Sequence, residues 1–318
     1  MIELFELGGI TATLVAAYQG SLLQALLNDR KTSVIYAEEL GLNPRATKHI
    51  LDILVSTGIA DCNEGRYGAS ASLKNLDDIS PGGIAALVAL WNQVPAFLLH
   101  GERFASMDGP PASREAAYSG VVAQLGQLFT PAAQLLAAHL AGQPTHILDV
   151  GAGSGIWSLS IAKRSLQARV TALDFPHVLQ TFHAQAEDMG LSHRIDTIAG
   201  DFHTVTIPAN CFDCIILANI LHLEPPEHAA LIYRVRPGLS AGGKLVIVDM
   251  FGGGSPERER SRAIYGLHLA LRTEQGCVHT LSQLQQWVRQ ADLIPADVID
   301  LAMPHGLGAL VASYPGKP

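Results

Sequence analysis

The stretch Ile-Leu-Asp-Val-Gly-Ala-Gly-Ser-Gly-Ile-Trp, residues 147–157, decides the fold. An apolar run that carries one acid, Asp149, ends in three glycines spaced two apart, Gly151, Gly153 and Gly155. A glycine-rich turn between a strand and a helix lets the backbone approach a ligand closely and points helix N–H groups at it. The stretch therefore predicts a β-strand, a ligand-binding turn and a helix.

Strand-like and helix-like segments alternate on both sides of this stretch. Strand candidates lie at 146–151, 168–174, 194–200, 212–219 and 243–250, with weaker ones at 296–302 and 308–314. Amphipathic segments of helical length separate them. This alternation predicts an α/β fold with a doubly wound parallel sheet over residues 111–318.

Residues 1–110 show helical periodicity instead and form a second predicted domain. Asn43 is a plausible helix N-cap and Pro44 suits the first turn, so two helices are expected to meet there. Residues 59–70 follow, with a turn at 63–65, and predict a short two-stranded wing. Helix, turn, helix and wing describe a winged helix, which we expect to serve dimerisation.

The charge of the chain argues against nucleic acid and membrane as partners. The net charge is −8, and residues 1–80 hold six basic and ten acidic residues. Both partners favour surfaces rich in Lys and Arg. The most apolar segment, 84–100, is interrupted by Asn92, Gln93 and Pro95, so it predicts a buried helix pair and no bilayer span.

Cysteine use and the N-terminus favour a cytoplasmic protein. The first residues show no basic leader, and the four cysteines show no disulfide framework. Cys211 and Cys214 form a C-x-x-C, but no second cysteine pair completes a zinc site. We interpret both as small apolar residues at the start of a strand and predict no metal site.

The glycine pattern selects among nucleotide ligands. The dinucleotide pattern requires a glycine where Ile156 stands. Asp174 ends the second strand, and its carboxylate can accept hydrogen bonds from two ribose hydroxyls. Asp201 and Phe202 follow the third strand and are placed to meet an adenine amino group and ring. Three glycines with acids after strands two and three resemble the pattern of S-adenosylmethionine-dependent methyltransferases. The predicted cofactor-binding set is Asp149, Gly151, Gly153, Gly155, Asp174, Phe175, Asp201, Phe202 and Asn219.

Nearly the whole chain resembles the small-molecule O-methyltransferases of the caffeic acid type and their bacterial relatives in antibiotic, phenazine and carotenoid pathways. The resemblance rests on the winged helix and on LDVGAGSG (148–155), ALDFPHV (172–178), GDF (200–202) and ILANILHLEPPEHA (216–229). It implies S-adenosylmethionine as cofactor and S-adenosylhomocysteine as product. It also implies a hydrophobic acceptor in specialised metabolism and a homodimer whose N-terminal half closes the other subunit's pocket.

The same resemblance implies the catalytic residues. His222 follows strand four, where the family carries its base, and Asp249 ends strand five, where an acid orients that base. A histidine titrates near neutral pH, and a carboxylate behind it fixes its tautomer. The chain departs from the family at Leu223 and Glu224, where the family has Asp and Trp, and at Val278, where it has a second acid.

The acceptor pocket is expected to be apolar and to suit a phenol or polyketide. Its predicted lining is Trp91, Phe97, Tyr118, Tyr265, His268, Leu269 and Arg272, with Gln93 and His100 near them. Alternatives remain open: C-methylation, with a metal on His222 and His268 as one variant, or a pericyclase-like catalyst that does not transfer its methyl group. A transcriptional regulator that acts through the winged helix is the other class.

Overall fold

The computed structural model describes residues 2–74, 83–140, 144–224, 230–251, 255–303 and 306–315. The chain forms two compact units, Met1–Asn92 and Gln93–Pro318. The sequence places the domain boundary at residue 110. In the structure the segment before that residue pairs with the second unit, because Phe104 N–H donates to Leu271 O at 2.8 Å and Met107 N–H donates to Arg272 O at 2.7 Å.

The first unit has the order of elements expected of a winged helix. It contains α1 (Ile2–Gln19), α2 (Leu22–Asn28), α3 (Ser33–Leu40), α4 (Pro44–Ser56), β1 (Ala60–Asn63), β2 (Arg66–Ala69) and α6 (Gly83–Asn92). The predicted cap is present, since Asn43 Oδ1 accepts from Ala46 N–H at 3.0 Å and Pro44 begins α4. The strands β1 and β2 pair antiparallel and form the wing.

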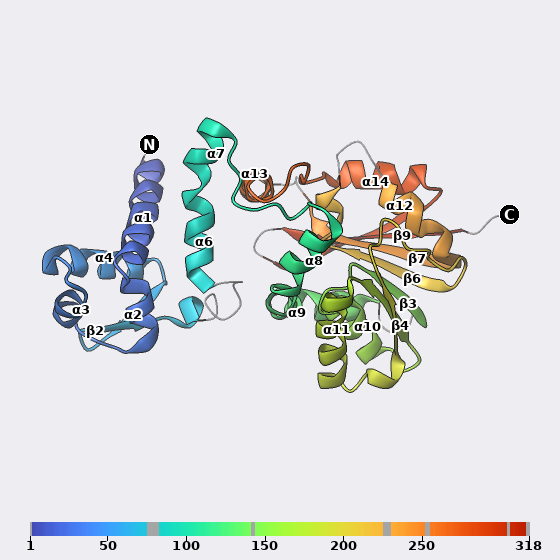
Figure 1. The fold of residues 1–318 in the computed structure, drawn as a ribbon, viewed down its shortest axis with the longest axis horizontal. Helices are drawn as coiled ribbons and strands as arrows, with labels where there is room; N and C mark the ends of the chain where they lie inside the picture. The colour runs from blue at the N-terminus through green and yellow to red at the C-terminus, as the bar shows by residue number, and fades with distance from the viewer. Residues whose placement is uncertain are drawn as a thin grey trace. The chain divides into compact units, whose positions relative to one another are not determined.

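The second unit is built on one seven-stranded sheet (Figure 1). Its strands are β3 (His146–Val150), β4 (Arg169–Asp174), β5 (Ile195–Ala199), β6 (Phe212–Ala218), β7 (Leu239–Met250), β8 (Ile294–Asp300) and β9 (Leu307–Ser313). Their order in the sheet is β5-β4-β3-β6-β7-β9-β8. The doubly wound α/β prediction is confirmed, with every predicted strand present.

One strand, β9, differs from the predicted parallel arrangement. β9 pairs antiparallel with both β7 and β8. Only residues 301–306 join β8 to β9. A parallel pair needs a crossover of about a dozen residues or more, so this short connection permits only an antiparallel pair.

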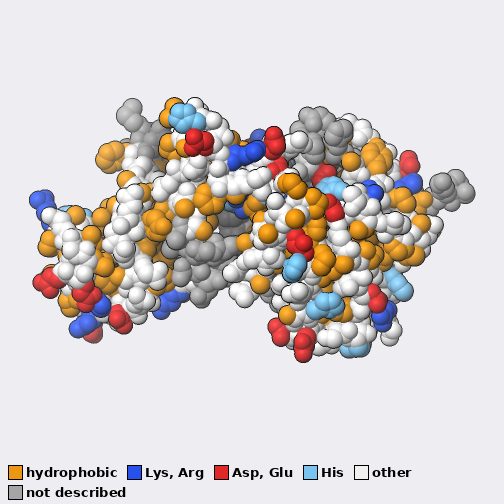
Figure 2. Space-filling view, viewed as in Figure 1, with side chains coloured by type: hydrophobic (Ala, Val, Ile, Leu, Met, Phe, Trp, Pro, Cys, Tyr) orange, Lys and Arg blue, Asp and Glu red, His pale blue; other side chains and the backbone are white. Residues whose placement is uncertain are grey.

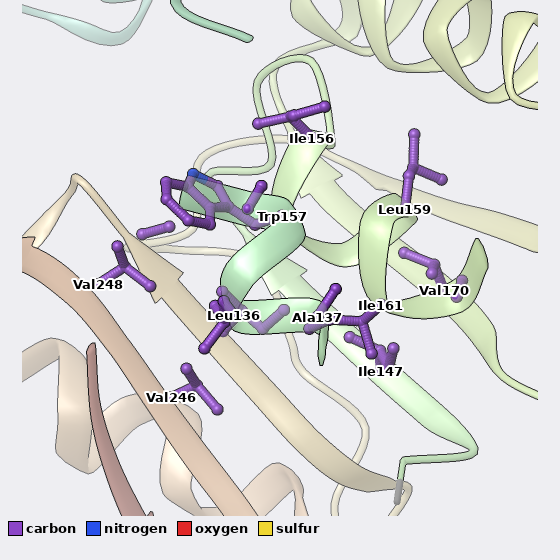
Figure 3. Close-up of a cluster of buried hydrophobic side chains, with 14 of the residues drawn as sticks. Leu136, Ala137, Ile147, Ile156, Trp157, Leu159, Ile161, Val170, Val246 and Val248 are labelled. Atoms are coloured by element: carbon purple, nitrogen blue, oxygen red, sulfur yellow. The ribbon is translucent and has the colours of Figure 1, made fainter. Parts of the chain in front are cut away.

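Helices cover both faces of the sheet and create two cores. The helices are α7 (Val94–His100), α8 (Pro111–Ser119), α9 (Val122–His139), α10 (Ile156–Arg164), α11 (Pro176–Asp188), α12 (Ala230–Val235), α13 (Pro256–Ala270) and α14 (Leu281–Gln290), with the short 3-10 helices η1 (Ser192–Arg194), η2 (Leu221–Leu223) and η3 (Arg236–Gly238). On one face α9 and α10 pack Leu136, Trp157 and Leu159 against Ile147 and Val246 of the sheet (Figure 3). On the other, α14 packs Leu284 and Trp287. The apolar strands are thus buried on both faces of the sheet. Because both faces are covered by helices, the residues that follow the strands at the carboxyl edge of the sheet are held in place.

Two expectations from the sequence need correction. The segment 84–100 does form two helices, α6 and α7, but α7 is not buried: Leu98 is 81% exposed and Leu99 is 72% exposed. Cys214 lies buried in β6, where burial raises the pKa of its thiol, whereas Cys211 is exposed. In the described residues no group of three or more His, Cys, Asp or Glu side chains is arranged so that it could hold a metal ion.

In the described part of the chain no single helix has the length and apolar character needed to cross a bilayer. Two sharply bent helix pairs, α1 with α2 and α8 with α9, reach that length and composition only when taken together.

On the face seen in Figure 2, acidic and basic side chains are interspersed over the winged-helix unit.

Candidate active site

The glycine-rich turn joins β3 to α10 at the carboxyl edge of the sheet. Gly151, Gly153 and Gly155 all have positive φ, at 65°, 56° and 73°. A Cβ on Gly151 would lie 2.9 Å from Ile220 Cγ2, and one on Gly155 would overlap the Phe182 ring. Positive φ and close approach both require glycine here, so the turn has the shape that the sequence predicts.

A pocket opens over this turn, entirely within the second unit. Seven predicted residues line it: Tyr118, Gly151, Gly153, Asp174, Phe175, Phe202 and Asn219. The other lining residues were not predicted from the sequence; they are Arg114, Val122, Leu125, Gly126, Phe129, Ala152, Ser154, Ile156, Trp157, Ala218, Ile220 and Leu223. Most of these residues lie on α8, α9 and α10. From the sequence alone, an apolar residue on such a helix could equally well belong to the hydrophobic core.

Asp174 forms the polar wall of the pocket. Its Oδ2 accepts from Gly153 N–H at 2.8 Å, and its Oδ1 accepts from Phe175 N–H at 2.7 Å. Burial raises the pKa of this carboxyl to about 6, although the two backbone hydrogen bonds oppose that rise. Each oxygen keeps a further lone pair. The carboxylate is therefore held in place to accept hydrogen bonds from two neighbouring hydroxyls.

Asp149 stabilises the glycine turn through a buried hydrogen bond to α10 and is not among the residues that line the pocket. It is 1% exposed, and its Oδ2 accepts from Ser158 Oγ at 2.5 Å. Burial raises its pKa to about 7. The bond ties β3 to the first turns of α10, so the two ends of the glycine turn stay aligned.

Asp201 belongs to a partly buried charge cluster of four side chains, Arg114, Asp201, His203 and Glu224. Arg114 forms an ion pair with Asp201. The His203 ring bridges two carboxylates, with Nδ1 at 2.9 Å from Asp201 Oδ1 and Nε2 at 2.7 Å from Glu224 Oε1. The bond to Glu224 is the main cause that raises the pKa of His203. Burial would raise the pKa of Asp201, but hydrogen bonds from His203 and the charge of Arg114 lower it. Glu224, one of the departures from the family pattern, thus anchors this cluster.

The helix α8 is fastened over the pocket by two adjacent residues. Arg114 Cζ lies 5.3 Å from the ring centroid of Phe175 and 6.0 Å from that of Phe202, both pocket residues. Glu115 Oε1 accepts from His177 N–H at 2.8 Å and lies 2.8 Å from His177 Nδ1. These contacts place the guanidinium across two aromatic walls of the pocket.

His222 and Asp249 form a buried hydrogen-bonded pair. His222 lies in η2, directly after β6, and Asp249 lies near the end of β7. The ring Nδ1 is 2.9 Å from Asp249 Oδ1, and His222 N–H donates to Asp249 Oδ2 at 3.2 Å. The exposed fractions are 7% and 4%. A carboxylate oxygen only accepts, so the ring proton lies on Nδ1 and Nε2 keeps a lone pair that can take a proton.

The segment around Val278 holds η2 without an acid. Cys277 N–H donates to His222 O at 2.8 Å. The buried His279 ring donates from Nε2 to Leu221 O at 2.9 Å, and burial lowers its pKa. Backbone and imidazole thus fix the turn at the position where the family carries its second acid.

Three of the predicted acceptor residues lie in one row beside His222. The Tyr265 ring centroid lies 5.7 Å from that of His222 and 5.7 Å from that of His268. Arg272 Nη2 lies 3.1 Å from His268 Nδ1. Burial raises the pKa of both the Tyr265 and the Tyr118 phenols, that of Tyr118 to about 12.

None of the remaining predicted acceptor residues is among those that line the pocket over the glycine turn. Leu269 is 1% exposed and packs as core. Phe97 is half-buried on α7 and does not line the pocket, and Trp91 belongs to the first unit. Gln93 Nε2 donates to Glu102 O at 3.1 Å, and His100 is exposed.

Comparison with known proteins was made for the sequence and for the fold. Residues 112–292 match the family model of the O-methyltransferase domain. The chain is 24% identical to a 3-hydroxy-5-methyl-1-naphthoate 3-O-methyltransferase of Streptomyces sahachiroi, over 94% of this chain and 90% of that protein. It is 23% identical to the tetracenomycin polyketide synthesis 8-O-methyl transferase of Streptomyces glaucescens, over 80% of this chain and 79% of that protein.

Solved structures share the fold. A putative O-methyltransferase of Nostoc punctiforme matches with a TM-score of 0.74 at 19% identity, over 98% of this chain and 97% of that one. A structure titled PigF with SAH matches with a TM-score of 0.73 at 19% identity, over 95% of each chain. The glycine turn, the buried carboxylate of Asp174 and the aromatic walls suit the cofactor of this family. The chain belongs to the O-methyltransferase family and is an S-adenosylmethionine-dependent enzyme.

Proposed function

We propose that the protein methylates a hydroxyl group of a hydrophobic aromatic or polyketide molecule in specialised metabolism, with His222 as general base and Asp249 as the acid that orients it. The observation that carries the proposal is the buried pair between His222 Nδ1 and Asp249 Oδ1, 2.9 Å apart. Acceptors of this kind also fit the names of the two Streptomyces relatives.

The residues of the chain divide the work of the reaction. S-adenosylmethionine supplies an activated methyl group. When the cofactor is bound, Asp174 would accept hydrogen bonds from its ribose, and Phe175, Phe202 and Leu223 would enclose its adenine. His222 Nε2 takes the proton of the acceptor hydroxyl, and Asp249 stabilises the imidazolium that forms. The burial of both side chains keeps water from competing for that proton.

We further propose a homodimer formed through the N-terminal half. Large apolar side chains are exposed on α1, where Phe5 is 85% and Leu7 is 56% exposed, and on α7, where Leu98 and Leu99 are exposed. Exposed apolar side chains gathered on helices are typical of subunit interfaces. In such a dimer the second subunit closes the acceptor pocket.

The experiment is methyl transfer from labelled S-adenosylmethionine to a panel of phenols, hydroxynaphthoic acids and an extract of the source cell. Label in an organic-extractable product supports the proposal, and NMR of the product separates oxygen from carbon. A C-methylated product, or tight cofactor binding with a product that carries no label, would replace O-methylation by one of the two alternatives.

A further inference from the structure

Arg272 carries a half-buried positive charge that no acid neutralises. Its Nη2 lies 3.1 Å from His268 Nδ1, and its Nη1 lies 3.6 Å from Met107 Sδ. Within the described ranges, no carboxylate oxygen lies within 4.0 Å of the guanidinium. Arg114 and Arg258, by contrast, each form an ion pair with an aspartate.

Neither neighbour of Arg272 supplies a negative charge. Burial, with the charges of Arg272 and His222, lowers the pKa of His268 to about 3, so this ring is neutral at pH 7 and its Nδ1 accepts a hydrogen bond. The Met107 thioether is only a weak acceptor. An unpaired charge away from water is costly, so its presence here calls for a ligand that repays the cost.

The position of the charge connects it to the reacting groups. The rings of His222, Tyr265 and His268 form a row that leads from the base to Arg272. The charge of Arg272 also lowers the pKa of the Tyr118 phenol, against the larger rise that burial causes, and Tyr118 lines the cofactor pocket. A molecule that presents a hydroxyl to His222 can therefore reach Arg272 with its far end.

We propose that Arg272 binds a carboxylate on the acceptor, so that the acceptor is a hydroxylated aromatic acid. The inference rests on the proposed function, because it takes His222 as the place of the reacting hydroxyl. A planar guanidinium donates two parallel hydrogen bonds to a carboxylate, and such charged bonds are stronger than neutral ones. The other source of a carboxylate is the cofactor itself. We favour the acceptor, because Arg272 is not among the residues that line the glycine pocket.

The test measures binding separately from turnover. Protein saturated with S-adenosylhomocysteine is titrated in a calorimeter with hydroxybenzoic and hydroxynaphthoic acids and with their carboxamides. We expect the wild type to bind at least one acid about tenfold or more tightly than its amide. Arg272→Gln should bind the two equally, and Arg272→Lys should fall between. Arg262→Gln, on α13, is the control, since Arg262 pairs with Glu259 and should leave the preference intact.

Several outcomes overturn the inference. One is a wild type that binds none of the acids more tightly than its amide. Another is an Arg272→Gln variant with weaker S-adenosylhomocysteine binding and an unchanged acid preference, which assigns the arginine to the cofactor. A third is equal loss of acid and amide with a lower melting temperature, which assigns it to the fold. Acid-selective binding without methyl transfer would count against the proposed function and leave the assignment of Arg272 standing.

Discussion

Asp174 shows how burial sets the working range of a single residue. Its carboxyl is almost completely enclosed, and burial moves its pKa from 3.8 to about 6. Ribose hydroxyls donate hydrogen bonds, so they need the ionised form. In the proposed function, the protonation state of this one side chain therefore controls how well the pocket holds the cofactor.

We predict that S-adenosylhomocysteine affinity falls as the pH drops below about 6, because protonation of Asp174 removes its negative charge and turns one of its two acceptor oxygens into a donor. Above the raised pKa the carboxylate is ionised and affinity should be constant. Well below it, the loss approaches about tenfold per pH unit. Calorimetry from pH 5 to pH 8 measures this. Asp174→Asn should bind weakly at every pH, and a variant that kept the wild-type pH profile would refute the assignment.

The pair of His222 and Asp249 supports a second prediction at this scale. His222→Gln removes the proton acceptor and should lower kcat by about 10²- to 10⁴-fold, with cofactor affinity unchanged. Asp249→Asn keeps the shape of the pair but not its charge, and should lower kcat in the same direction. Label transfer measures kcat, and calorimetry checks the cofactor. Near-full turnover in His222→Gln would show that proximity alone suffices.

Among the elements, the short helix α8 contributes Arg114 and Tyr118 to the pocket. It spans Pro111–Ser119 and is held by Arg114 to Asp201 and by Glu115 to His177. The first contact is largely buried and belongs to a cluster that includes His203 and Glu224, whereas the second is more exposed. The two attachments therefore differ in strength.

We predict that Arg114→Gln weakens cofactor binding more than Glu115→Gln does. The Arg114 variant leaves the carboxylate of Asp201 short of a counter-charge and removes the guanidinium from over Phe175 and Phe202. Losing one member of a buried pair is costly, while exposed pairs contribute little. Hydrogen exchange of α8 and S-adenosylhomocysteine titration measure the effect. Equal behaviour of the two variants would show that α8 is not fastened through Arg114.

The elements also show which features of the fold and the site could be predicted from the sequence. Strand ranges, the glycine turn and the cap at Asn43 were predictable because each depends on local spacing, and the pair of His222 and Asp249 was expected from the resemblance to the family. The antiparallel direction of β9 relative to β8 depends on the short connection of residues 301–306, and the alternation of strands and helices along the sequence does not reveal it. Arg114 was missed, because one arginine on a short helix gives no signal until the fold places it over Phe175.

At the scale of the whole molecule, the exposed apolar side chains of α7 matter most. Leu98 and Leu99 lie at the end of a short helix that buries none of its residues. The sequence predicted burial there, and the proposed dimer is the arrangement that would provide it.

We predict that the double substitution Leu98→Ser and Leu99→Ser shifts the protein from dimer to monomer, because it removes apolar area from the proposed interface. Sedimentation velocity at micromolar concentration measures the change. Leu166→Ser is the matched control, since Leu166 is 82% exposed and lies between α10 and β4. A wild type that sediments as a monomer, or a double variant that remains dimeric, would remove α7 from the interface.

The antiparallel pairing of β7 with β9, in which Asp249 lies opposite Gly308, has a consequence for the order of events during synthesis. Asp249 lies in β7, which is enclosed in the sheet by β6 on one side and β9 on the other. The ribosome makes β9 long after it has made β7, and domains fold as units while the chain emerges. The sheet around the acid is therefore completed late, when Gly308 arrives. Because the domain folds as a unit, the glycine turn and the acid behind the base are expected to reach their final places together, once β9 has joined the sheet.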